Sequence, residues 1–130
     1  MVFPPSIFFF HSLITIHCTD IAQSSPELAN KYIRSLCEVL ASVPPGGMAG
    51  ESAETISSIT SLLYHTAARC ERNRDAAHAT LYGSTVCALL ALAVAAASLR
   101  LVLDAVNYFL TLEKPESYWC VIRIQGFKKV

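Results

Sequence analysis

Charged residues are scarce in this chain. Asp, Glu, Lys and Arg make up 15% of its 130 residues, whereas 53% are hydrophobic. A soluble globular domain carries about 25% charged residues, so the sequence has few of the groups that keep a monomer in solution. Ten acidic residues balance ten basic ones, and no overall field attracts a nucleic acid. The shortage of charge indicates that a lipid bilayer or a large protein surface is the partner, and that nucleic acid is not.

Motifs for catalysis, nucleotide binding and metal binding are also missing. The sequence has no Walker A loop, no G-x-G-x-x-G, no H-E-x-x-H and no G-x-S-x-G. His65 and His78 lie five and eight residues from Cys70, which separates them from it by about 140° and 80° around a helix. The cysteines are odd in number, widely spaced and without a C-x-x-C pair: Cys18, Cys37, Cys70, Cys87 and Cys120. We therefore expect free thiols, no cofactor, no metal and no enzymatic activity.

Residues 1–24 form an apolar N-terminal segment whose status the sequence leaves open. Met1–Thr19 contains no Lys, Arg, Asp or Glu, but the basic start and the small-residue cleavage site of a secretory signal are missing. The segment is a weak signal or anchor, a strand or irregular stretch packed on the body, or an extension. In the last case translation starts at Met48, and residues 1–47 do not belong to the native protein.

Residues 25–75 are predicted to form an amphipathic helical region, and its first helix runs from Pro26 to Ala41. Ser25 is a favourable N-cap residue, and Pro26 suits the first helical position. Apolar side chains recur every four residues, at Leu28, Tyr32, Leu36 and Leu40, as in a helix with one buried face. The Pro- and Gly-rich stretch 43–47 ends this helix.

The second helix of this region is predicted to begin near Glu51 or Ser52 and to reach Cys70. Its apolar stripe is interrupted by several Ser and Thr residues, so it needs a partner surface to be stable. A short charged patch, 69–75, follows it without Pro or Gly. We therefore expect the helix to continue through the patch into the next segment.

Residues 76–113 are predicted to form one long Ala/Leu-rich apolar helix. Ala76–Leu99 holds 24 residues without a formal charge, and a membrane span needs about 20. The five Leu and two Val between Leu81 and Leu99 supply only about −2 to −4 kcal/mol of insertion free energy, so a lone helix inserts marginally and needs companion helices. A central helix of a soluble bundle has the same composition. Both interpretations stay open, with the membrane span preferred.

Small residues on one side of this helix allow another backbone to approach closely. They predict a helix-packing face of Gly83, Cys87, Ala88, Ala91, Ala95 and Ser98. Beyond this face, Arg100 and Asp104 stand at i and i+4, where they can form an intrahelical ion pair. Alternatively, Arg100 reaches towards lipid headgroups as the helix leaves a membrane.

Residues 114–130 are predicted to be a C-terminal tail. Pro115 ends the long helix. Tyr118–Gln125 is rich in aromatic and β-branched residues, a composition typical of a short strand. Tyr118 and Trp119 are alternatively anchors at a membrane interface.

These patterns together predict a mainly α, non-catalytic small membrane protein. Two amphipathic helices precede one long helix that crosses the membrane once, and a strand-like segment follows it. The layout resembles that of small accessory subunits of membrane complexes, which implies an intracellular membrane and other membrane helices as partners. The alternative is a soluble all-helical interaction module that oligomerises, or binds a partner, through its Ala-rich helix.

Overall fold

The chain is mainly helical, as predicted. The structure is a computed structural model that describes residues 24–48 and 53–112. Within these ranges it forms α2 (Pro26–Ala41), α3 (Ala53–Arg72), α4 (Ala76–Ala96) and α5 (Leu99–Phe109). The strand expected at Tyr118–Gln125, the tail 114–130 and all but the last residue of the segment 1–24 lie outside the described residues.

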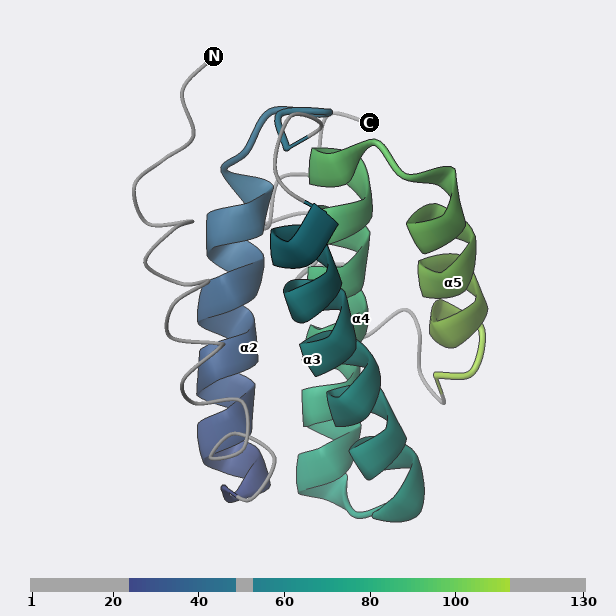
Figure 1. Ribbon diagram of the computed structural model, residues 1–130. Helices are drawn as coiled ribbons and strands as arrows, with labels where there is room; N and C mark the ends of the chain where they lie inside the picture. The colour runs from purple at the N-terminus through teal and green to yellow at the C-terminus, as the bar shows by residue number, and fades with distance from the viewer. Residues whose placement is uncertain (1–23, 49–52, 113–130) are drawn as a thin grey trace.

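Helix α4 is the centre of the fold, because α2, α3 and α5 all pack against it. In Figure 1 α4 runs behind α3, with α2 on one side and α5 on the other. Every residue from Leu81 to Leu89 is buried, and so are Ala91–Ala93 and Ala95. A helix that is apolar all round has to be covered on all sides, and here the covering helices belong to the same chain.

Helix α2 has the predicted bounds and the predicted cap. The Ser25 hydroxyl accepts a hydrogen bond from the Leu28 backbone N–H at 3.3 Å, and Pro26 occupies the first turn. The buried face is shifted slightly from the predicted stripe, because Leu28 and Tyr32 are nearly half exposed. The face that packs inward consists of Ala29, Ile33, Leu36, Cys37 and Leu40.

The charged patch does not continue the helix, contrary to the sequence expectation. Helix α3 ends at Arg72, and α4 begins after Asp75. The Asp75 carboxylate accepts the backbone N–H of His78 at 2.8 Å, so it caps a new helix. Asn73 turns the chain, with its backbone N–H donating to the Arg69 carbonyl at 3.1 Å.

The apolar region 76–113 likewise consists of two helices rather than one. Ala97 adopts a left-handed backbone conformation, with φ 53°. The Ser98 N–H donates to the Ala93 carbonyl at 3.1 Å and the Ala97 N–H to the Val94 carbonyl at 3.2 Å, which is the Schellman pattern of a helix end. The Ser98 hydroxyl then caps α5 by accepting the Leu101 N–H at 3.3 Å.

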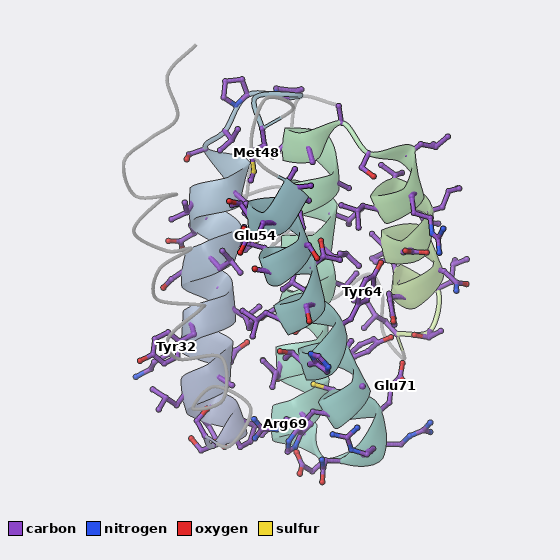
Figure 2. The ribbon with its side chains drawn as sticks, viewed as in Figure 1. Tyr32, Met48, Glu54, Tyr64, Arg69 and Glu71 are labelled. Atoms are coloured by element: carbon purple, nitrogen blue, oxygen red, sulfur yellow. The ribbon has the colours of Figure 1, made fainter. Side chains whose placement is uncertain are left out.

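The loop after α2 completes this end of α4. The Gly46 N–H donates to the Val94 carbonyl at 2.9 Å, and the Met48 N–H donates to the Ala95 carbonyl at 2.8 Å. Carbonyls in the last turn of a helix lack the usual donors four residues further along the chain, so the loop supplies one donor to Ala95 and a second donor to Val94, which also accepts the Ala97 N–H. Gly46 has φ 74°, a conformation that favours glycine. Met48, labelled at this end of the bundle in Figure 2, is fully buried.

Candidate functional site

Helix α5 and the turn that follows it, as far as Leu112, carry stripes of side chains that each follow spacings of four, three and four residues. One stripe faces the bundle: Leu101, Ala105, Tyr108 and Leu112. A polar stripe runs beside it: Arg100, Asp104, Asn107 and Thr111. A third stripe is apolar and exposed: Leu99, Leu103, Val106 and Leu110. Because a helix turns about 100° per residue, the third stripe points away from the first. Helix α5 therefore has two apolar faces, of which α4 covers one.

The exposed stripe, which we call the outer face of α5, is the candidate site. Its residues are 72% (Leu99), 58% (Leu103), 45% (Val106) and 72% (Leu110) exposed. Single exposed apolar residues are normal on a soluble protein, but a contiguous set marks an interaction surface. Two other large apolar side chains, Leu28 and Tyr32, are exposed on α2 in the part of the chain that is described.

A tyrosine cluster of Tyr64, Tyr82 and Tyr108 fixes α5 to the bundle. The ring centroids of Tyr64 and Tyr108 lie 6.0 Å apart, and those of Tyr82 and Tyr108 6.2 Å apart, which are favourable aromatic separations. The Tyr82 hydroxyl also shares a hydrogen bond of 2.7 Å with the Thr111 hydroxyl. Helices α3, α4 and α5 meet at this cluster. The helix that carries the outer face is therefore fixed in position against the other two.

The Tyr64 hydroxyl donates a hydrogen bond to the Asp104 carboxylate, and Figure 2 shows Tyr64 reaching from α3 towards α5. Burial, followed by this hydrogen bond, raises the pKa of Tyr64 to about 12. The hydroxyl therefore remains a donor at neutral pH. Arg100 Nε lies 3.6 Å from Asp104 Oδ2, so the two residues expected to pair within the helix are close. The Arg100 side chain is 87% exposed, and solvent screening makes this ion pair weak.

The small residues of the predicted packing face are used inside the chain. Gly83, Cys87, Ala88, Ala91 and Ala95 are all buried on α4, while Ser98 has become the cap of α5. Cys37 of α2 stands close enough to Cys87 for burial and the neighbouring thiol to raise its pKa. Helix α2 thus occupies at least part of the space that was expected to receive another chain.

A second polar cluster joins the ends of three helices. Arg69 Nε donates to His78 Nε2 at 3.3 Å, and His78 Nδ1 lies 2.9 Å from Asp75 Oδ1. Arg69 can only donate, so the His78 proton sits on Nδ1 and both ring nitrogens are engaged. Arg69 Nη2 also reaches the Ser24 carbonyl at 2.5 Å. Arg69 of α3 thus links His78 of α4 to the segment just before α2, and His78, with both ring nitrogens engaged, has none left to act as a general base.

The hydrogen bonds from the His78 backbone and ring hold the pKa of Asp75 below its ordinary value. The charged carboxylate therefore stabilises the fold at neutral pH, and this contribution is lost as pH falls and Asp75 takes up a proton.

The thiols of α2, α3 and α4 do not resemble nucleophiles. Cys37, Cys70 and Cys87 are free and buried. Burial raises the pKa of Cys70 to about 11, whereas a reactive cysteine needs a lowered pKa and access to solvent. Within residues 24–48 and 53–112, no three His, Cys, Asp or Glu side chains form a group that could hold a metal ion.

Helix α4 is long and apolar enough to cross a membrane, by length and composition. The core helix of a soluble protein meets the same criteria, and 72% of the most apolar stretch of α4 is buried inside the chain. Comparison with protein-family models, curated proteins and solved structures finds no match to this chain.

Proposed function

We propose that the chain is a soluble, non-catalytic helical module that acts by binding protein through the outer face of α5. The observation that carries this proposal is that α2 and α3, which cover α4 together with α5, expose charged side chains on their outer sides. The charged side chains of α2 are exposed along the whole helix: Glu27, Lys31, Arg34 and Glu38. On α3 the exposed charges include Glu54, Glu71 and Arg72.

A comparison of free energies supports the soluble assignment. If α4 crossed a bilayer with the bundle intact, the charges of α2 would enter the hydrocarbon beside it. Each charged residue near the bilayer centre costs roughly 2.5 to 3.5 kcal/mol, whereas the apolar side chains of α4 contribute only about −2 to −4 kcal/mol in total. Two such charges on α2 already outweigh the gain. The folded bundle is thus poorly suited to a membrane.

The binding assignment follows from the two apolar faces of α5. Leu101 and Ala105 already bury one face of this helix of 11 residues against the bundle. The outer face adds a second apolar surface where polar residues would suffice for solubility. A binding role accounts for it. The Ala-rich α4 was the expected contact surface of the soluble alternative, and α5 takes that place here because α4 is enclosed.

Membrane fractionation of the full chain tests the proposal. We expect the protein in the soluble fraction, monodisperse without detergent and with one cooperative thermal transition. A version that begins at Met48 is the control, since it lacks α2 and uncovers α4, and it should leave the soluble fraction. A full chain that sediments with membranes and resists carbonate extraction would contradict the proposal.

The second candidate is an accessory subunit of a membrane complex, favoured by the length and composition of α4. In that case α2 and α3 separate from α4 in the bilayer, and companion helices pack on the small residues from Gly83 to Ala95. Carbonate resistance of the full chain would support this candidate.

A further inference from the structure

We infer that Arg69, His78 and the Ser24 carbonyl form a pH-sensitive latch, which is closed while the His78 ring is neutral and opens when the ring takes up a proton. The latch lies at the end of the bundle where α3 turns into α4, and Figure 2 shows Arg69 at this end. Helix α2 starts at the same end (Figure 1). The latch does not use the outer face of α5, so the inference is independent of the proposed function.

The latch depends on one ring nitrogen that accepts a hydrogen bond. His78 Nε2 accepts from Arg69 Nε at 3.3 Å, and the same guanidinium reaches the Ser24 carbonyl through Nη2. Only a neutral imidazole has an accepting nitrogen, because both nitrogens of the imidazolium are donors. A proton that binds Nε2 from solvent therefore leaves two donors facing each other. It also places a positive ring beside a guanidinium that stays charged.

The other side of the ring keeps its partner in both charge states. His78 Nδ1 lies 2.9 Å from Asp75 Oδ1 and carries the proton of this contact. The His78 backbone N–H, followed by the ring, holds the pKa of Asp75 below its ordinary value. The carboxylate therefore remains charged in mildly acidic solution and continues to cap α4. Protonation of the ring thus breaks the contact with α3 and spares the start of α4.

The surroundings of the ring make Arg69 the group that has to move. His78 is buried, so its repulsion from Arg69 is little screened by solvent. In the described ranges, the charged groups in contact with the ring are Arg69 and Asp75. The end of α5, which reaches Tyr82 one turn further along α4, has no charge in residues 107–112. The neighbouring charged residues of α3, the turn and the start of α2 are exposed: Glu71, Arg72, Arg74, Glu27 and Lys31.

Opening of the latch loosens the start of α2. One guanidinium makes the contacts with both His78 and Ser24, so its departure from the ring also removes the tie to Ser24. The Ala29 N–H donates to the Ser25 carbonyl at 2.9 Å, and its hydrogen exchange reports on this first turn. Histidine is the side chain that normally changes its charge between about pH 5 and 8. We therefore expect the latch to open in this range.

An NMR titration of the full chain from about pH 7.5 to 5 tests the inference. The His78 ring nitrogens, the Arg69 Nε–H and the Ala29 amide should change with one common midpoint. Corrected for the intrinsic effect of pH on exchange, the Ala29 protection factor should fall roughly 10-fold, as for the loss of one hydrogen bond to a charged group. The Ala79 N–H, which donates to the Asp75 carbonyl at 2.9 Å, is the internal reference and should keep its protection.

His78→Gln is the decisive variant, because its side-chain oxygen accepts a hydrogen bond but takes up no proton in this range. Protection of Ala29 should then be independent of pH. His65→Gln, at an exposed position of α3, is the matched control and should keep the full response. His11 and His17 are unchanged in both variants, so a response that comes from them would survive in His78→Gln.

Arg69→Gln gives a second test that leaves the ring in place. The ring of His78 should still titrate, whereas Ala29 should be weakly protected at every pH. The inference is overturned by a His78 ring that stays neutral down to pH 5, or by a ring that titrates while the Arg69 Nε–H stays protected. A pH response of Ala29 that persists in His78→Gln also overturns it.

Discussion

At the scale of the residue, Ala97 determines where the apolar region divides. It is the one non-glycine residue with positive φ in the described ranges, and a side chain in the left-handed region costs roughly 1–2 kcal/mol. Helices usually place glycine here. The cost is tolerated because the Schellman hydrogen bonds of Ala97 and Ser98, and the donors of Gly46 and Met48, all require the chain to turn at this point.

Ala97→Gly should therefore stabilise the protein. Glycine relieves the left-handed strain and loses part of that gain to its greater freedom in the unfolded chain. We expect a net gain of about 0.5–1 kcal/mol and a Tm higher by about 2–4 °C, measured by thermal unfolding followed by circular dichroism. Ala96→Gly, in the last turn of α4, is the control and should lower the Tm. A fall in Tm for both variants would show that Ala97 is not strained.

At the scale of the element, the sequence predicts some helix boundaries and not others. Ser25 and Pro26 mark the start of α2 because a cap and a preset φ act locally, whatever the rest of the fold does. Asp75 and Ser98 are equally good cap residues. Each lies in a stretch without Pro or Gly, where the chain could also continue as an unbroken helix. The competition is decided by tertiary contacts, since α3 and α5 turn back to pack on α4.

The candidate site was present in the sequence but hidden by its surroundings. Leu99, Leu103, Val106 and Leu110 have a clear helical spacing, yet the inward stripe of α5 has the same spacing and is also apolar. Periodicity alone does not say which of two apolar faces is covered. The small residues from Gly83 to Ala95 were recognised as a packing face, but the sequence could not tell whether their partner was this chain or another.

The small residues of α4 lead to a second prediction. Ala91 is 1% exposed, so Ala91→Leu forces extra methylene groups into filled space and should lower the free energy of unfolding by about 1–3 kcal/mol. Ala79→Leu, on an exposed position of the same helix, is the control and should change it by less than about 0.5 kcal/mol. Urea denaturation gives both values. Equal effects would mean that the surroundings of Ala91 are loosely packed.

At the scale of the whole molecule, α4 is the helix against which all the other described helices pack. Helices α2, α3 and α5 contact one another mainly through it, and the polar cluster of Arg69, Asp75 and His78 closes one end of the bundle. The hydrophobic core is therefore a single unit around one helix, and it should open as a unit.

This arrangement predicts common protection of the thiols of α2, α3 and α4. Cys37, Cys70 and Cys87 are buried, and burial raises the pKa of each, so little thiolate is available for alkylation. We expect iodoacetamide to modify all three slowly and at similar rates in buffer, and rapidly above the unfolding midpoint in urea. Peptide mapping by mass spectrometry measures each site. Fast modification of one thiol alone would mean that its helix detaches separately.

The cover that α2, α3 and α5 form over α4 also has a consequence for synthesis on the ribosome. Helices α2 and α3 precede α4 along the chain, so two of its three covering helices have already emerged when its apolar residues appear. Translation adds roughly 5–20 residues per second, which leaves seconds for the new helix to dock before cellular machinery that recognises exposed apolar segments can capture it. Because of this order, α2 and α3 are synthesised before the apolar helix α4 that they cover.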